Sequence, residues 1–134
     1  MTDQEWQNLK DKVNKPSKRK KPDHPESKLQ QNCVTWFRLQ YPNLVLFAIP
    51  NGGKRGDIEA KIMKGEGVLA GVADLFLMYP NKEFHGLFIE MKFGKGSQTD
   101  SQIDFQRKAE SAGFKYEVAN SFDRFREISN NYLK

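Results

Sequence analysis

The sequence predicts a single α/β domain in which a mixed β-sheet is flanked by helices. Its 134 residues are enough for one hydrophobic core and too few for two. Segments with the three- and four-residue periodicity of amphipathic helices alternate along the chain with short apolar runs that are typical of buried strands. Their order is helix, strand, helix, two strands, helix, strand, helix, which indicates helices packed against a sheet.

A basic arm at residues 1–25 precedes the domain, which we place at residues 26–134. The arm carries seven Lys or Arg against four acidic residues, a surplus of three, whereas the rest of the chain has a surplus of two. A basic arm on a nearly balanced domain suits contact with a polyanion, although charge alone fits a solvated tail equally well. Residues 1–13 could form a short helix within the arm. The basic run that would contact DNA phosphates is Lys18, Arg19, Lys20 and Lys21.

Three features of the sequence bear on the compartment. No run approaches the ~20 apolar residues that a membrane span needs. Residues 1–5 lack the basic and then apolar layout of a secretory signal. The single cysteine, Cys33, cannot form an internal disulfide and lies among apolar neighbours, so we expect it to be packed in the core. These features predict a protein of the reducing cytoplasm that has no membrane contact.

The first helix of the domain is expected at residues 26–40, where apolar side chains form one buried stripe. Glu26 falls on the same stripe, so we expect its carboxylate to point toward the interior, where an unpaired charge is costly. The stripe consists of Leu29, Cys33, Trp36 and Phe37. Strands are expected at about 44–49, 72–78, 86–93 and 114–119, and helices at about 57–64, 100–112 and 121–132, with Gly113 ending one helix and Ser121 capping the next.

The charged residues Asp74, Glu90 and Lys92 form the candidate site. Glu90 and Lys92 are two positions apart on one strand, so their side chains share a face. If the two central strands pair as an antiparallel hairpin centred near Lys82, opposed positions sum to about 164, and Asp74 then faces Glu90. Two facing carboxylates repel each other unless a cation lies between them.

A hard divalent cation fits these residues best. The chain has one cysteine and two histidines, so an oxygen-rich site that also includes Glu26 favours Mg²⁺ or Mn²⁺ over Zn²⁺. Lys92 beside the metal would orient or deprotonate a water, or stabilise charge on a phosphate. Metal-activated water next to a cation is the equipment of a nuclease.

Each member of this set has a simpler explanation when it is taken alone. Asp74 could be a turn residue at the start of a strand, and Glu26 a first-turn charge that favours the helix dipole. The Glu-x-Lys pattern occurs a second time at Glu59 and Lys61, in a predicted surface helix. The prediction therefore depends on the combination of an acid on one strand, Glu-x-Lys on the next and a glutamate on a preceding helix.

These residues also resemble a known family. Residues 71–74 (GVAD), 86–92 (GLFIEMK) and 99–102 (TDSQ), followed by Gly113, are similar in order and spacing to the motifs of the VRR-NUC domain. This virus-type replication-repair nuclease belongs to the PD-(D/E)XK superfamily, and its short stand-alone phage and bacterial members are the most similar in layout. The resemblance covers about residues 26–130 and implies a restriction-endonuclease-like core.

The resemblance implies an endonuclease that uses Mg²⁺ or Mn²⁺ to hydrolyse DNA. Glu26, Asp74, Glu90 and Lys92 stand at the family's catalytic positions. The resemblance further implies that Gln102 faces the site, although helical spacing alone favours a surface position for it. The backbone carbonyl of Met91 would be an additional metal ligand.

Relatives of the stand-alone type imply a substrate class and an assembly. They resemble structure-specific enzymes that act on branched DNA such as Holliday junctions, often as homodimers, in a phage-infected or bacterial cytoplasm. The chain departs from many relatives at Ala73, where they carry proline. Because Asp74 is kept, we expect this change to affect entry into the strand rather than the chemistry.

The glycine-rich loop at residues 50–56 is a second candidate DNA contact. Asn51, Lys54 and Arg55 could place an amide and two cations on phosphates, although a flexible turn explains the glycines nearly as well. Three other functions compete with a structure-specific nuclease: a DNA-binding module without chemistry, a sequence-specific restriction-type endonuclease, and a structural metal-binding protein. Facing carboxylates argue against a pure DNA binder, because they repel phosphates.

Overall fold

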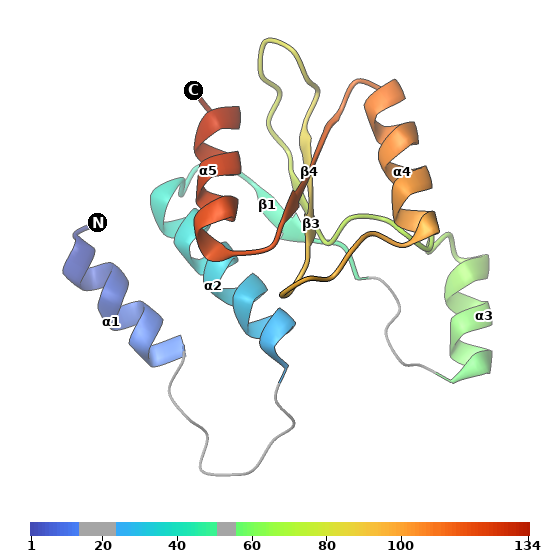
Figure 1. The fold of residues 1–134 in the computed structure, drawn as a ribbon, viewed down its shortest axis with the longest axis horizontal. Coiled ribbons are helices and arrows are strands. Elements are labelled where there is room, and N and C mark those ends of the chain that lie inside the picture. The colour runs from blue at the N-terminus through green and yellow to red at the C-terminus, as the bar shows by residue number, and fades with distance from the viewer. Residues whose placement is uncertain (14–23, 51–55) are drawn as a thin grey trace.

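A four-stranded mixed sheet forms the centre of the molecule (Figure 1). The computed structural model describes residues 1–13, 24–50 and 56–134. Within these ranges the strand order is β1-β2-β3-β4, with β1–β2 and β2–β3 antiparallel and β3–β4 parallel. The predicted mixed sheet is therefore confirmed, and each strand is shorter than expected. The strands are β1 (Leu46–Ala48), β2 (Leu75–Leu77), β3 (Leu87–Met91) and β4 (Lys115–Ala119).

Helices cover both faces of this sheet. In Figure 1, α2 and α5 lie on one side of the strands and α4 lies on the other, while α1 packs outside α2. The predicted helices of the domain are all found, and so is the short helix expected within the arm. The helices are α1 (Asp3–Val13), α2 (Pro25–Gln40), α3 (Asp57–Gly65), α4 (Asp100–Ser111) and α5 (Phe122–Tyr132).

The hydrophobic core lies between the sheet and the pair of helices α2 and α5. Alternate residues of β2 and β3 point into it, because successive side chains of a strand face opposite sides. Cys33 of α2 is fully buried there as predicted, and burial raises the pKa of its thiol to about 12. At neutral pH this thiol stays protonated and serves for packing. The strand residues of the core are Leu46, Leu75, Leu77, Leu87, Ile89, Met91 and Ala119.

The opposite face of the sheet is aromatic and is partly covered by α4. Phe88 of β3 packs against Phe76 of β2 and against Phe105 of α4, with ring centroids 4.6 and 5.0 Å apart. Phe105 in turn lies 6.2 Å from the ring of Tyr116 on β4. These ring contacts fix α4 over β3 and β4, and so they also fix the residues that α4 carries at its N-terminal end.

Side-chain caps set the ends of the helices that border the site. Thr99 caps α4 in a capping box: its hydroxyl accepts a bond from the backbone N–H of Gln102, and the Gln102 side chain accepts one from the backbone N–H of Thr99. Gly113 follows α4 with a positive φ of 92°. Ser121 caps α5 by accepting a bond from the backbone N–H of Arg124. The predicted helix stop and the predicted cap are both confirmed.

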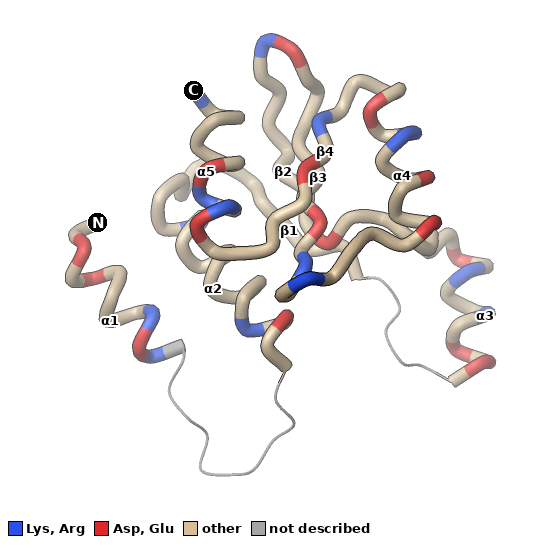
Figure 2. Tube along the Cα trace, in the orientation of Figure 1, with Lys and Arg blue, Asp and Glu red and all other residues tan. Residues whose placement is uncertain are grey.

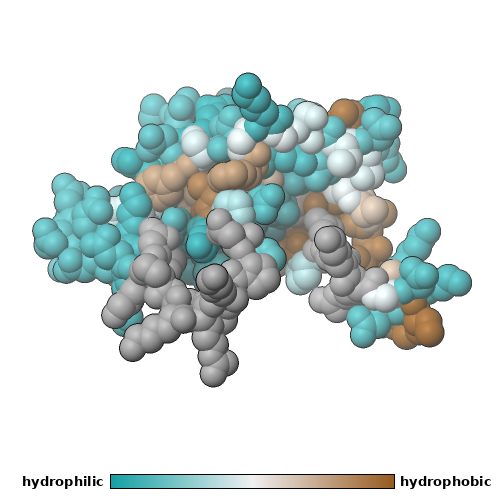
Figure 3. All heavy atoms as spheres, turned by 60° about the horizontal axis from the view of Figure 1, so that its bottom comes forward, coloured by the Kyte–Doolittle hydropathy of each residue, from teal (hydrophilic) through white to brown (hydrophobic). Residues whose placement is uncertain are grey.

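Two helices lie at the periphery. Trp6 of α1 stacks on Phe122 of α5 with ring centroids 5.6 Å apart. α3 has no buried residue, and its Ile58 is 78 % exposed. Figure 3 shows α3 projecting from one end of the molecule with apolar side chains on its surface. Among the described residues, no helix combines the length and apolar character needed to cross a membrane.

Candidate active site

Asp74 and Glu90 meet where β2 begins and β3 ends. The register pairs Leu75 with Ile89, whose numbers sum to the predicted 164. Asp74 precedes β2 by one residue, and its Oδ2 accepts a hydrogen bond of 2.7 Å from the backbone N–H of Met91. The carboxylate of Asp74 is therefore tied to the strand that carries Glu90, and the predicted hairpin register is confirmed.

Glu90 is a buried carboxyl group in which only one of the two oxygens has a hydrogen-bond partner. Its side chain lies on the α4 face of the sheet and the residue is 3 % exposed. Its Oε1 accepts a hydrogen bond of 3.1 Å from Nε2 of Gln102. Its Oε2 is buried and has no hydrogen-bond partner among the described residues. A buried oxygen of this kind is costly unless another group compensates for it.

The surroundings of Glu90 disfavour its charged form. Burial, joined by the neighbouring carboxyl of Asp74, raises the pKa of this carboxyl from 4.5 to about 8. Lys92 and the hydroxyl of Tyr116 act in the opposite direction, but they do not outweigh the burial. The metal-free protein therefore holds this carboxyl largely protonated at neutral pH, and a nearby cation would return it to the carboxylate form.

Gln102 joins the lysine to the glutamate. Nζ of Lys92 donates to Oε1 of Gln102 at 2.8 Å, while Nε2 of the same amide donates to Glu90. The backbone N–H of Thr99 also donates to Oε1, at 2.9 Å, so the orientation of the amide is fixed by three contacts. Gln102 thus faces Glu90, as the resemblance implied. Along β3 an acidic position is followed by a basic one at the end of the strand (Figure 2).

The approach to Asp74 is locked against α4. Gly71 has a φ of +88°, a conformation that L side chains rarely adopt. A Cβ atom at this position would overlap the backbone carbonyl group of Ser101 in the first turn of α4. The loop that leads to Asp74 and the turn that carries Gln102 are therefore in contact backbone to backbone.

Two residues of this neighbourhood were missed by the sequence analysis. Tyr116 of β4 is 5 % exposed, and its hydroxyl accepts a hydrogen bond of 3.2 Å from Nε2 of Gln98. A tyrosine in a predicted strand reads as a core residue, and a glutamine before a helix reads as a loop residue. The parallel pairing of β4 with β3 brings Tyr116 near Glu90, and Gln98 reaches Tyr116 from the segment that precedes α4.

The structure does not bring Glu26 into the group. Its side chain is exposed in the first turn of α2, so the expectation of an inward carboxylate is wrong. The first buried residue of α2 is Cys33, two turns later, which leaves the first turn beyond the core, where a carboxylate favours the helix N-terminus. In the described parts of the chain, no three His, Cys, Asp or Glu residues are grouped so that they could hold a metal.

Several predicted DNA contacts cannot be placed. The loop residues Asn51, Lys54 and Arg55 and the basic run of residues 18–21 lie outside the described residues. Their roles stay predictions, as does the role of the Met91 carbonyl as a metal ligand.

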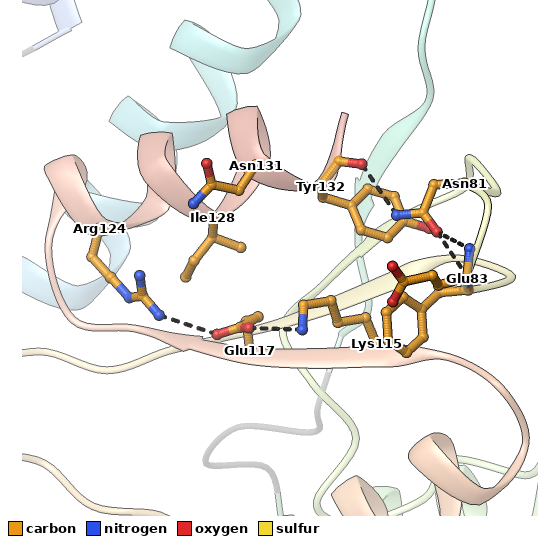
Figure 4. Close-up of a pocket in the computed structure, with 9 residues that line it drawn as sticks. Asn81, Glu83, Lys115, Glu117, Arg124, Ile128, Asn131 and Tyr132 are labelled. Atoms are coloured by element: carbon orange, nitrogen blue, oxygen red, sulfur yellow. Dashed lines mark hydrogen bonds and ion pairs between the residues drawn. The ribbon is translucent and has the colours of Figure 1, made fainter. Parts of the chain in front are cut away.

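A second polar pocket lies on the α5 face of the sheet (Figure 4), with a volume of about 340 Å³. In this pocket the carboxylate of Glu117 lies between Lys115 at 3.2 Å and Arg124 at 3.3 Å. None of these three residues was predicted as a functional residue. The wall is completed by Asn81, Glu83, Phe84, Ile128, Asn131 and Tyr132.

Comparison with known proteins identifies the family. The model of the VRR-NUC domain matches residues 18–123. The chain belongs to the VRR-NUC domain family. A solved structure described as a VRR_NUC domain protein has the same fold, with a TM-score of 0.68 and 23 % sequence identity over 84 % of this chain and 91 % of that chain. Among curated proteins, none matches this chain.

Family membership sets the general activity of this VRR-NUC domain. It is a nuclease-type domain of the endonuclease class, and DNA is the substrate that membership suggests. The solved VRR_NUC structure supports the architecture, a mixed four-stranded sheet flanked by helices in a single domain. The resemblance that the motifs at residues 71–74, 86–92 and 99–102 indicated is therefore confirmed at the level of family and fold.

Proposed function

We propose that this VRR-NUC domain is a divalent-metal-dependent endonuclease that hydrolyses DNA phosphodiester bonds. One observation carries the metal dependence: Glu90 is buried beside Asp74 and leaves Oε2 without a hydrogen-bond partner among the described residues. Two adjacent carboxyl groups with an unsatisfied buried oxygen fit Mg²⁺ or Mn²⁺, which prefer oxygen ligands and keep several waters in their coordination shell. Such a cation would replace the missing partner and relieve the repulsion between the two carboxylates.

Asp74 and Glu90 would hold the cation from two strands. Asp74 is oriented by the N–H of Met91, and Glu90 by the amide of Gln102, so each carboxylate already has one oxygen fixed. When bound, the cation supplies a Lewis acid that polarises a phosphate and lowers the pKa of a water. The carbonyl of Met91 is a further proposed ligand, and so is Glu26, whose exposed carboxylate is not grouped with the other two here.

Lys92 would act on the substrate rather than on the cation. Its ammonium donates to the neutral amide of Gln102 at 2.8 Å, which holds the positive charge beside the carboxylates. There it can stabilise the negative charge that develops on a phosphate, or orient the attacking water. Gln102 sets the position of Lys92 and Glu90 together, because one amide contacts both side chains.

We extend the proposal to branched DNA, such as four-way junctions, cut by a homodimer. The support is the resemblance to short stand-alone members of the family. Symmetric resolution of a four-way junction needs two cuts, which a dimer with twofold symmetry provides. Sedimentation equilibrium with and without junction DNA tests the assembly, and a monomer in both conditions would contradict it.

The deciding experiment compares nicking of plasmid and junction DNA by the full chain in EDTA, Mg²⁺ and Mn²⁺. We expect cleavage only with a divalent cation, and a preference for the junction over linear duplex. Cleavage in EDTA would exclude the metal proposal. Binding without cleavage under every condition would favour the competing function, a DNA-binding module. Cutting confined to one short duplex sequence would instead favour a restriction-type endonuclease.

A further inference from the structure

Tyr116 places a polar group in the core of the sheet that the proposed reaction does not use. In the parallel pairing of β3 with β4, Tyr116 lies opposite Phe88 and Val118 lies opposite Glu90. Tyr116 and Glu90 therefore share the α4 face of the sheet as diagonal neighbours on adjacent strands, within reach of a long side chain. The tyrosine is buried, so its hydroxyl needs a partner inside the protein.

A pair of glutamines orients this hydroxyl. Nε2 of Gln98 donates to the tyrosine oxygen at 3.2 Å and to Oε1 of Gln106 at 2.9 Å. Because the oxygen of Tyr116 accepts from Gln98, its own hydrogen is left to be donated in another direction. Gln106 stands one helical turn after Gln102 on α4, so the same helix contacts both Gln98 and Glu90.

The carboxyl group of Glu90 lies on that same face of the sheet. Its Oε1 is held by Gln102, whereas its Oε2 has no partner at hydrogen-bond distance in the described structure. Burial raises the pKa of Tyr116 to about 12, with smaller contributions from Gln98 in the opposite direction and from Glu90 and Asp74 in the same one. Tyr116 therefore keeps its proton at neutral pH and has a hydrogen to donate to a neighbouring acceptor.

We infer that Tyr116 is a positioning residue for Glu90, with the Gln98–Gln106 pair holding the tyrosine and the tyrosine holding the carboxylate opposite Gln102. This inference rests on the proposed function, because the orientation of Glu90 affects activity only if Glu90 binds a cation. The placement of Tyr116 beside Glu90 on one face of the sheet is already present without a metal. Side chains that orient a metal ligand typically change metal affinity or activity by about 10- to 100-fold when they are removed.

The test compares two substitutions that each delete one buried tyrosine hydroxyl. Tyr116→Phe removes the group in question. Tyr132→Phe is the matched control, because its hydroxyl donates to the carbonyl of Tyr79 at 2.6 Å in the pocket on the other face. We expect Tyr116→Phe to lower Mn²⁺ affinity about 10-fold or more, measured by calorimetry, and to lower kcat with little change in KM for DNA. Gln98→Ala should have a Mn²⁺ affinity and a kcat between those of Tyr116→Phe and wild type.

The control should bind Mn²⁺ within about twofold of wild type. Equal Mn²⁺ affinity and kcat for Tyr116→Phe and wild type would overturn the inference. An equal loss in Tyr132→Phe would also overturn it, because the effect would then reflect a general loosening of the fold.

A metal-free measurement separates this inference from the proposed function. Thermal unfolding in EDTA of Tyr116→Phe, Glu90→Gln and the double variant forms a double-mutant cycle. We expect the two shifts in the unfolding midpoint to deviate from additivity by about 2 °C or more. Additive shifts overturn the inference. If the shifts are non-additive but the protein binds no Mn²⁺, the inferred interaction between Tyr116 and Glu90 stands and the proposed metal-dependent function is rejected.

Discussion

The two charged clusters of this domain lie on opposite faces of one sheet and are built in opposite ways. On the α5 face, Glu117 lies between two cations, and the three side chains are between 24 % and 40 % exposed. On the α4 face, Glu90 is 3 % exposed, has Asp74 beside it and shares its amide partner with Lys92. In the first cluster the carboxylate is paired with two cations. The second leaves a buried carboxyl oxygen without a partner among the described residues.

This difference shows which kind of charge pattern marks chemistry. Partly exposed ion pairs such as those of Glu117 contribute little and require no further ligand. A buried carboxyl next to another carboxyl costs stability, and such an arrangement persists where a function depends on it. The second Glu-x-Lys pattern, on α3, is another exposed charge pattern that requires no ligand. Glu59 and Lys61 are both exposed on this surface helix.

The largest expected effect separates cleavage from binding at the α4-face cluster. Asp74→Asn and Glu90→Gln keep the shape of the site but each leave one carboxylate fewer to hold the cation. We expect DNA cleavage with Mn²⁺ to become undetectable. DNA binding without metal should be at least as strong as in wild type, because Asp74→Asn reduces repulsion of the backbone and Glu90→Gln replaces a carboxyl that is largely protonated without metal. Plasmid nicking and fluorescence anisotropy measure the two quantities.

The lysine at the same cluster should behave differently from the carboxylates. Lys92→Ala should also lose cleavage, yet it should bind Mn²⁺ as well as wild type or better, because a neighbouring cation is gone. The matched control is Lys61→Ala in the exposed repeat on α3, which should cut normally. Robust cutting by Glu90→Gln or Lys92→Ala would show that these residues are not the active site.

A second prediction concerns stability against pH. The pKa of Glu90 is raised in the folded state, so its contribution to stability is complete below pH 4.5 and is lost as the pH rises toward about 8. Each pH unit within this window costs up to about 1.4 kcal/mol in the free energy of unfolding. Glu90→Gln lacks this loss, so in EDTA it should unfold at a higher temperature than wild type at pH 8.

The difference in unfolding temperature between Glu90→Gln and wild type should become smaller toward pH 4.5. Calorimetry in EDTA across this pH range measures it. Glu117→Gln is the control, since that carboxylate is paired with two cations and lies outside the site. A gap that is the same at pH 4.5 and pH 8 would contradict the assignment of the raised pKa to Glu90.

Much of the fold followed from local patterns in the sequence. Turn and cap residues such as Thr99, Gly113 and Ser121 act over a few positions, so the helix boundaries next to the site were predictable. The hairpin register followed from placing the centre of the turn between β2 and β3 near Lys82, since a turn limits slippage of the two strands. The contact of Asp74 with the strand of Glu90 came from that register.

The errors concern relations between distant segments. Glu26 lies on the apolar stripe by spacing, yet the first turn of α2 extends past the core, and periodicity carries no information about where a helix leaves its neighbours. Tyr116 lies near Glu90 only because β4 pairs in parallel with β3, and the sequence of β4 does not encode this pairing locally. The strands were predicted too long, because apolar residues continue beyond the paired positions.

A smaller effect is expected from the basic run in the N-terminal segment. Replacing Lys18, Arg19, Lys20 and Lys21 by Ser should weaken DNA binding without abolishing cleavage at high enzyme concentration, because lysines in such a run bind phosphates rather than bases. The slope of log K against log salt should become less steep by about 0.9 for each phosphate that the substituted run no longer neutralises. An unchanged slope would refute a role for this run in binding.

The smallest effect is expected at the α5-face cluster. Glu117→Gln should change the free energy of unfolding by no more than about 1 kcal/mol, since ion pairs that are partly exposed to solvent are weak. Cleavage of junction DNA should be unchanged. A large loss of activity would show that the two clusters are not separate in function and would break the comparison.

The contact between Gly71 and Ser101 joins the segment before Asp74 to the first turn of α4. With no side chain to act as a spacer, the segment that presents Asp74 rests directly on the turn that presents Gln102. We expect a tilt of α4 to move the Asp74 segment with it, because no side chain separates the two backbones. We therefore expect Asp74 and Gln102 to meet DNA already at a fixed spacing.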